Sequence, residues 1–319
     1  MMSGIWIFAE NRELTLELLN AGRNLADELG VNLVALAAAE QFAQEYIKHG
    51  ADEVLLLPSL NKEQPLEAYV PVMVEAARNA DPDVFFIGAT RRGKEMATRI
   101  AASLNTGLCT ECNSFALDQD KKFLVMERLI YGGKAIQKIV CSTRPQMATI
   151  PARTFEQAPL QEGKEGKITS LPSAPFSAVK VINRTPKVQE AVDITEAKII
   201  VSVGRGVEKK EDIALAEELA RILGGTIGCS RPVAEDLHWL PEEVYMGISG
   251  KKVKPDLYIG LGVSGQIQHI TGIRDSKVIF AINRDENAPI FDAADYGIVG
   301  DLYDVVPKLI KELGNVLKI

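Results

Sequence analysis

Several features that mark whole classes of protein are scarce in this sequence. Of its 319 residues, 4 are cysteine and 3 are histidine. That count argues against a disulfide framework and a histidine-rich metal site, and it favours a reducing cytoplasm. There is no block of basic residues and the formal net charge is -7, so nucleic acid is not an expected partner. No apolar run approaches the roughly 18 residues that a membrane-spanning helix needs.

Ordinary globular composition remains, with 46% hydrophobic and 25% charged residues. The opening segment MMSGIWIFAENRE has no basic stretch before its apolar run, so it predicts a first strand and no signal peptide. Strand-like and helix-like segments then alternate, which predicts a parallel sheet flanked by helices. The predicted strands are 5–9, 31–37, 53–57 and 84–88, and the predicted helices are 13–29, 41–48, 66–79 and 94–104.

The alternation changes after Gly107. Segments 122–131 and 134–141 flank Gly132-Gly133, a hairpin signal, and we expect the hairpin to add antiparallel strands to the parallel sheet. Residues 158–178 are rich in Pro, Gly, Ser and charge, so we expect them to cross the surface toward a second domain. An alternative for residues 179–182 is an extended strand that belongs to the first domain.

The strand and helix pattern resumes near Asp193. Predicted strands are 199–203, 257–259, 278–282 and 296–299, and predicted helices are 211–223 and 302–313. The sequence therefore predicts an α/β fold with two domains, each a mainly parallel sheet flanked by helices. We assign 1–187 to a scaffold and partner-binding domain and 188–319 to a Rossmann-like domain that binds the ligand.

A glycine-rich turn in the second domain is the first candidate for a site. Residues 260–265 read GLGVSG after a strand, which fits the G-x-G-x-x-G dinucleotide-binding pattern, and Asp285 lies where an acidic residue would meet a ribose. The segment after the turn is short, and Gly272 is expected to break it. On spacing alone, a nucleotide site and a tight structural turn are equally open.

Two arginines follow other strands of the same predicted sheet. Arg205 lies between two glycines, and Arg231 follows the short apolar segment 226–228 within CSRP. Because ligands bind at the carboxyl edge of open α/β sheets, guanidinium groups there suit a pyrophosphate or an electron-rich ring. The alternative for Arg205 is a solvated side chain on a flexible loop.

Other candidates are weaker. The pair Cys109-x-x-Cys112 has redox or zinc spacing, but no second pair accompanies it, so chance is the better interpretation. His49 suits the end of a helix, and His238 has no assigned role. Residues 262–266 resemble a nucleophile elbow without its last glycine, which makes a hydrolase a poor third reading.

The second domain closely resembles the electron transfer flavoprotein alpha subunit (FixB) family. The segments that carry the resemblance are GRG at 204–206, SRPVAED at 230–236, ISGKKVKPDLYIGLGVSGQIQH at 248–269, AIN at 281–283 and DYGIVGDL at 295–302. In the first domain, GATRRGKEMATRIAASL at 88–104 and STRPQMATIPAR at 142–153 are similar to family segments but less specific. The resemblance therefore covers nearly the full chain.

The resemblance implies one FAD in the second domain, no nicotinamide on this chain, and an obligate heterodimer with a beta subunit. It places Arg205 near the pyrophosphate, Ser230, Arg231 and Ser249 at the flavin ring, and His269 near the ring oxygen O2. We expect Arg231, Ser249 and His269 to affect the redox step. The implied cofactor-binding residues are Arg205, Ser230, Arg231, Ser249, Gly250, Gly262, Ser264, Gly265, Gln266, Gln268, His269, Asn283 and Asp301.

The implied function is electron transfer from a dehydrogenase, acyl-CoA dehydrogenase in the first instance, to a quinone reductase or a ferredoxin-linked acceptor. Membership of an electron-bifurcating complex stays open, because the extra site would be on the beta subunit. Many family members carry glutamine where this chain has Ile248, so the surroundings of the flavin can differ here. The alternative function is an NAD(P)-dependent dehydrogenase built on the same glycine pattern.

Overall fold

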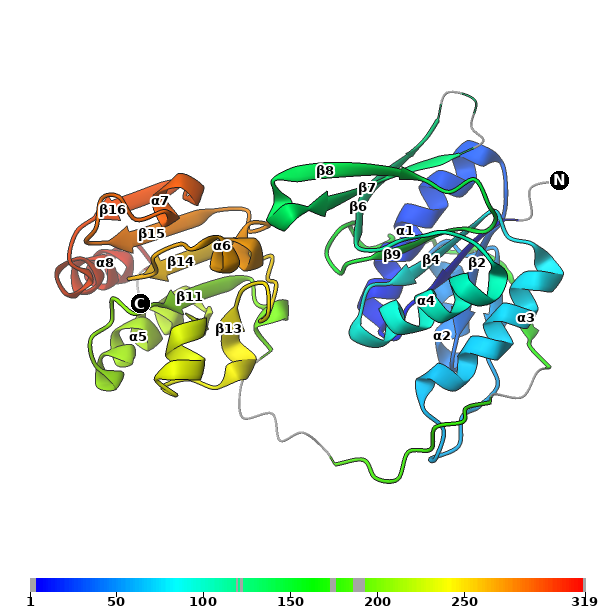
Figure 1. The fold of residues 1–319 in the computed structure, drawn as a ribbon, viewed down its shortest axis with the longest axis horizontal. Coiled ribbons are helices and arrows are strands. Elements are labelled where there is room, and N and C mark those ends of the chain that lie inside the picture. Colours follow the sequence, from blue (N-terminus) through cyan, green and yellow to red (C-terminus); the bar gives the residue numbers. More distant parts are fainter. Residues whose placement is uncertain (1–3, 119, 121–122, 173–175, 186–192, 318–319) are drawn as a thin grey trace. The chain divides into compact units, whose positions relative to one another are not determined.

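Figure 1 shows the computed structural model, which describes residues 4–118, 120, 123–172, 176–185 and 193–317. Its internal contacts divide the chain into two compact units, Met1–Thr185 and Pro186–Ile319. Each unit has its own sheet of parallel strands and its own helices, so the two-domain α/β prediction is confirmed. The predicted boundary, between residues 187 and 188, lies outside the described residues.

A sheet of seven strands forms the centre of the first unit, in the order β10-β3-β2-β1-β4-β9-β5, with every neighbouring pair parallel. Its strands are β1 (Ile5–Phe8), β2 (Leu33–Ala37), β3 (Glu53–Leu56), β4 (Val84–Gly88), β5 (Leu108–Cys109), β9 (Gln146–Ile150) and β10 (Lys167–Ser170). The helices are α1 (Arg12–Leu29), α2 (Glu40–Lys48), α3 (Val70–Ala80) and α4 (Arg91–Leu104).

Alternation along the strands builds two apolar layers in this unit. On β1, Ile5 and Ile7 pack with α1 and α2, whereas Trp6 and Phe8 pack with α3 and α4. Successive strand residues point to opposite faces, so a buried parallel strand is apolar throughout. The N-cap Asn11 begins α1 by accepting a hydrogen bond from the Leu14 amide at 2.9 Å.

The predicted hairpin is present, but the prediction that it extends the parallel sheet is wrong. Strands β7 (Leu124–Ile130) and β8 (Ala135–Val140) pair with β6 (Cys112–Leu117) in a separate antiparallel sheet. Leu124 and Met126 point into the apolar layer that α1 also covers, so burial of this face places the sheet across the core. The expected start of the hairpin, Lys122, lies outside the described residues.

The segment 158–178 was expected to be a surface crossing, yet part of it belongs to the first sheet. Lys167–Ser170 forms β10, which pairs in parallel with β3 at the edge of the sheet. Its short, mostly polar sequence KITS, in which no residue is fully buried, suits an edge strand. Residues 179–182 form no strand, although the Val181 amide donates to the Glu63 carbonyl at 2.8 Å. Residues 173–175 lie outside the described part.

The second unit has six parallel strands in the order β13-β12-β11-β14-β15-β16. They are β11 (Ile199–Val203), β12 (Thr226–Ser230), β13 (Tyr245–Met246), β14 (Leu257–Leu261), β15 (Ile279–Asn283) and β16 (Tyr296–Val299). The helices are α5 (Ile213–Leu223), α6 (Ile267–Ile273), α7 (Ile290–Ala293) and α8 (Leu302–Leu317). One apolar cluster joins the sheet to α5 and α8.

Gly272 does not break the helix that precedes β15, as the sequence had suggested. Helix α6 includes Gly272 and ends at Ile273. A Cβ atom at Gly272 would lie 2.4 Å from the Gly247 amide nitrogen, so the glycine serves a close approach of two main chains. Packing against the segment after β13 therefore explains a residue that helix propensity alone would make a terminator.

Candidate functional site

The carboxyl ends of the six strands of the second unit lie along one edge of its sheet, because every pair is parallel. Strand β11 ends at Val203, directly before Gly204, and β14 ends at Leu261, directly before Gly262. The strand order runs one way from β11 and the other way from β14, which makes this point a topological switch (Figure 1). Open α/β sheets bind ligands at such a point.

At the switch point the two glycine turns are in direct main-chain contact. The Gly204 amide donates to the Leu261 carbonyl at 2.9 Å, and the Gly206 amide donates to the Gly262 carbonyl at 3.0 Å. A Cβ atom at Gly204 would lie 2.2 Å from the Gly262 oxygen. Gly262 itself has a φ of 61°, and a Cβ there would lie 2.6 Å from the Gly206 Cα. Both turns therefore need glycine to pack this closely.

Side chains that could meet an anion extend from these turns. Arg205 is exposed, and within the described residues it makes no ion pair or hydrogen bond. Ser264 and Gln266 are exposed as well. Gly265 is buried with a φ of 80°, and a Cβ there would lie 2.2 Å from the Ile290 amide nitrogen, which donates to the Ser264 carbonyl at 3.1 Å. The turn at 262–265 is thus held in place by its contacts with Ile290, while the side chains of Ser264 and Gln266 remain exposed to solvent.

Asn283 and Asp301 lie together at the β15 side of the edge. The Asn283 amide nitrogen donates to the Val263 carbonyl at 2.8 Å, and its main-chain oxygen accepts from Gly300 at 3.0 Å. The Asp301 carboxylate accepts from the Tyr303 amide at 2.9 Å, at the start of α8. A hollow of about 40 Å³ lies here, lined by Gly206, Glu208, Gly262, Asn283, Arg284, Gly300, Asp301, Leu302 and Tyr303.

Ser230 and Arg231 follow the neighbouring strand. Ser230 is buried at the end of β12, whereas the Arg231 side chain is 64% exposed. The Arg231 Nε donates to the Glu235 carboxylate at 2.5 Å, and this ion pair raises the pKa of Arg231 and lowers the pKa of Glu235. The guanidinium is therefore charged, but part of its field is neutralised by a carboxylate one helical turn away.

Ser249 and Gly250 lie beyond β13. The Tyr245 hydroxyl donates to the Ser249 Oγ at 3.3 Å, and a Cβ atom at Gly250 would lie 2.3 Å from the Tyr245 ring. The Ile248 amide donates to the carbonyl of Gln268 at 2.9 Å, so this segment is tied to α6. Gln268 and Ser249 are exposed, while the Ile248 side chain is 54% exposed. Ile248 thus presents an apolar side chain to the surface.

His269 is placed differently from the other predicted site residues, because it is only 7% exposed. Its Nε2 lies 2.8 Å from the Tyr258 hydroxyl. Its Nδ1 is buried and has no hydrogen-bond partner within the described residues. Burial lowers the pKa of His269 to about 4, with the Met246 main chain acting weakly against the shift. At neutral pH the imidazole is therefore uncharged, so His269 offers the site a donor or acceptor and no positive charge.

Two tyrosines that the sequence did not single out help to hold the site. Tyr258 binds His269 from β14, and Tyr303 of α8 joins three segments. The Tyr303 hydroxyl donates to the Asp212 carboxylate at 2.7 Å and accepts from the Glu208 amide at 2.9 Å. Asp212 and Glu208 are 91 and 95 residues distant along the chain. Such separations leave no local signal, so the sequence alone could not have revealed these contacts.

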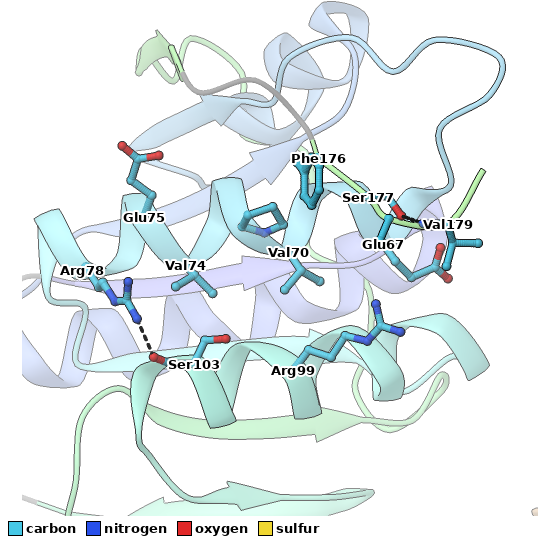
Figure 2. A pocket seen from close by; sticks show the side chains of 12 residues that line it. Glu67, Val70, Val74, Glu75, Arg78, Arg99, Ser103, Phe176, Ser177 and Val179 are labelled. Carbon is cyan, nitrogen blue, oxygen red and sulfur yellow. Dashed lines mark hydrogen bonds between the residues drawn. The ribbon is translucent and has the colours of Figure 1, made fainter. Parts of the chain in front are cut away.

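A larger hollow in the first unit does not match this pattern. It measures about 690 Å³ and lies between α3, α4 and residues 176–179 (Figure 2). Both of its arginines are already engaged, since Arg78 donates to the Ser103 carbonyl at 2.8 Å and Arg99 to the Glu95 carboxylate at 2.5 Å. No predicted site residue lines it, and it is open to solvent, so the edge of the second sheet is the better candidate.

The cysteines and His49, which the sequence also offered as candidates, occupy buried or helix-capping positions. All four cysteines are free and buried, and the part of the chain that the structure describes holds no cluster of three His, Cys, Asp or Glu side chains that could bind a metal. His49 caps the end of α2, and its Nδ1 lies 2.7 Å from the Ala158 carbonyl oxygen. Among the helices described, none combines the length and the apolar character that crossing a membrane requires.

Comparisons with known proteins agree in both units. The model of the electron transfer flavoprotein domain matches residues 5–175, and that of the electron transfer flavoprotein FAD-binding domain matches residues 193–274. A protein named FixB from Clostridium saccharobutylicum is 40% identical over 98% of this chain and 97% of its own length. An electron transfer flavoprotein subunit alpha from Clostridium acetobutylicum is 40% identical over 97% of this chain and 96% of its own. A FixB protein of Escherichia coli O1:K1 is 37% identical over 96% of this chain and 97% of its own.

Proposed function

This chain belongs to the electron transfer flavoprotein alpha subunit (FixB) family, and on that premise we propose that it binds one FAD at the carboxyl edge of its second sheet. The observation that carries the proposal is the contact of the two glycine turns at the topological switch point, where Gly204 and Gly206 meet Gly262. Open α/β sheets bind their ligands outside the carboxyl ends of the strands at such a switch point.

Three features of this edge fit a dinucleotide of the FAD type. Gly262 packs against the main chain of Gly206, so two glycine turns lie together at the ends of β11 and β14, where a dinucleotide is expected. Arg205 is an exposed cation with no ion-pair partner in the described residues, which suits a pyrophosphate. The buried Nδ1 of His269 lacks a partner, and a buried polar atom without one is costly unless a ligand supplies it.

The residues of the edge divide the cofactor among them in this proposal. Arg205, Ser264 and the turn Gly262–Gln266 hold the phosphates, and Asn283 and Asp301 hold the adenosine end beside the small hollow. Ser230, Arg231, Ser249 and Gly250 face the flavin ring, and Gln268 and His269 reach it from α6. FAD supplies the one-electron and two-electron chemistry when it is bound, while the chain orients it and sets its potential.

The cation that faces the ring in this account is Arg231. A positive group near the reduced ring stabilises the extra negative charge and raises the midpoint potential. His269 is uncharged at neutral pH, so its part is limited to hydrogen bonding. Glu235 shares the Arg231 guanidinium and moderates its effect.

The partners follow from the family. We place a beta subunit beside this chain in an obligate heterodimer, an acyl-CoA dehydrogenase as electron donor, and a quinone reductase or ferredoxin-linked protein as acceptor. Bifurcation, if the complex performs it, needs a second FAD on the beta subunit. A cytoplasmic location is supported by four free, buried cysteines in a chain of 319 residues.

Purification with the beta subunit tests the proposal without any added cofactor. We expect a yellow protein with flavin absorbance bands and FAD, identified by chromatography after denaturation. A colourless protein that binds NADH would instead support the alternative, an NAD(P)-dependent dehydrogenase. The same purification of the Arg205→Gln variant tests the role of the arginine. We expect this variant to contain less FAD, because the pyrophosphate loses a cation.

A further inference from the structure

Buried polar groups from three elements of the second unit lie close together, and one of them, His269, is a residue of the proposed flavin site. Ser202 of β11 and Tyr258 of β14 are both 0% exposed, and His269 of α6 follows them. The Tyr258 hydroxyl lies 2.8 Å from the His269 Nε2. Ser202 Oγ meets no partner at full hydrogen-bond geometry in the described residues, yet it lies close enough to oppose the rise that burial causes in the pKa of Tyr258. Three neutral polar groups thus adjoin one another in an apolar core.

The surroundings of the imidazole decide where its single proton lies. A buried phenol donates its hydrogen to the acceptor within reach, and the other polar neighbour of Tyr258, Ser202 Oγ, makes no hydrogen bond in the described residues. The acceptor at hydrogen-bond distance from the Tyr258 hydroxyl is the His269 Nε2, 2.8 Å away. Nδ1 therefore carries the proton, and Nε2 accepts one from the Tyr258 hydroxyl.

We propose that Tyr258 is a positioning residue of the flavin site, which holds His269 in the neutral tautomer with its proton on Nδ1. This inference rests on the proposed function for its last step, in which the Nδ1–H meets a carbonyl oxygen of the flavin ring. Nδ1 has no partner at hydrogen-bond geometry in the described residues, and a buried donor in that condition calls for an acceptor from outside the chain.

The same contact fixes the neighbouring segment of the site. His269 lies on α6, and the carbonyl of Gln268 on that helix accepts the Ile248 amide at 2.9 Å. Anchoring His269 to β14 through Tyr258 therefore also fixes the position of Ile248 and Ser249. Loss of the tyrosine hydroxyl removes a donor from a buried ring nitrogen, while the aromatic ring that fills the core is kept in phenylalanine.

The test compares wild type with Tyr258→Phe, each as the heterodimer with the beta subunit and with ¹⁵N-labelled histidine. In the wild type, the ring nitrogens of His269 should show one neutral tautomer with the proton on Nδ1 between pH 5 and pH 8. The variant should show a mixture of tautomers and a raised pKa of His269. Its dissociation constant for FAD should rise by about five- to tenfold, and the bound flavin should have a more negative midpoint potential.

Two further proteins make the comparison specific. Tyr46→Phe removes a hydroxyl from a buried tyrosine in the first unit, 5% exposed, and should leave the His269 signals and the flavin unchanged. Assignment of the signals comes from their loss in His269→Gln. If Tyr258→Phe does not fold, Ser202→Ala takes its place, and its shift of the His269 signals should have the same direction and a smaller size.

The inference is overturned if wild-type His269 carries its proton on Nε2, or if removing the Tyr258 hydroxyl changes neither the tautomer nor the flavin. Failure of the proposed function has a different signature. In that case wild-type protein binds no FAD, while the tautomer of His269 in the flavin-free protein is still that predicted from Tyr258. A change in flavin properties without any change in the tautomer would also contradict a role that acts through His269.

Discussion

Substitution of Gly262 by alanine tests whether the contact between the two glycine turns holds the site together. Gly262 has a φ of 61°, and its Cβ would lie 2.6 Å from the Gly206 Cα and 3.0 Å from both the Gly206 carbonyl carbon and amide nitrogen. All three neighbouring atoms belong to the main chain, so no side-chain rotation can relieve the clash. The turns must therefore separate.

Two costs contribute to the expected loss of stability. The left-handed conformation costs an alanine about 1–2 kcal/mol relative to glycine. Forcing an extra carbon into a filled space costs about 1–3 kcal/mol more. Gly224 supplies a matched control, because it has a φ of 66° but no atom within 4 Å of its Cβ position. Gly224→Ala should thus show the conformational cost alone.

The measurement is urea unfolding of the flavin-free full chain, monitored by tryptophan fluorescence. Each unit contains one tryptophan, Trp6 in the first and Trp239 in the second, and Trp239 reports on the unit that carries the substitution. Gly262→Ala should lose about 2–5 kcal/mol of unfolding free energy and Gly224→Ala about 1–2 kcal/mol. FAD binding should weaken in the first variant alone. Equal losses in the two variants, with unchanged FAD affinity, would refute the reasoning.

Three other outcomes follow from named contacts. Arg231→Ala should make the flavin midpoint potential more negative and Glu235→Gln more positive, as measured by potentiometric titration; unchanged potentials would remove Arg231 from the site. Asp52→Asn should lower the unfolding free energy by about 1.5–3 kcal/mol at pH 7, because the Asp52 carboxylate accepts hydrogen bonds from Arg23, Lys164 and the Leu33 amide. Although burial opposes them, these contacts lower the pKa of Asp52. In urea titrations of the wild type, the stabilisation should therefore be lost as the pH falls below about 4. In flavin-free protein, burial of neutral His269 should make unfolding free energy fall by up to about 1.4 kcal/mol per pH unit from about pH 6.5 toward pH 4, and His269→Gln should flatten that slope; equal slopes would contradict the burial.

Strong apolar patterns made most of the second sheet predictable. Strands Ile199–Val203 and Tyr296–Val299 occur at the predicted residues, since each is a compact run bounded by glycine or charge. Helix ends were less predictable: α8 continues to Leu317, four residues beyond the prediction, and passes through Gly314 and Asn315, residue types that commonly end a helix. The hairpin was found from Gly132-Gly133, but its partner sheet depends on long-range burial that the turn does not encode.

For the site, the sequence could indicate which residues lie at the strand ends but not how they are engaged. The turns at Gly204 and Gly262 were expected at one edge, and the structure places them in contact there. Arg231 and Glu235 are separated by four residues, so their ion pair could have been anticipated from helical spacing. The burial of His269 behind Tyr258 could not, because it depends on the packing of α6 against β14.

The most direct test of the central claim is an experimental structure of the purified heterodimer with the beta subunit. We predict a flavin dinucleotide on this chain, with its phosphates at the turns of Gly204 and Gly262 and its ring toward Ser230 and Ser249. An edge that is empty in a flavin-containing preparation, or one that holds a pyridine nucleotide, would contradict the account.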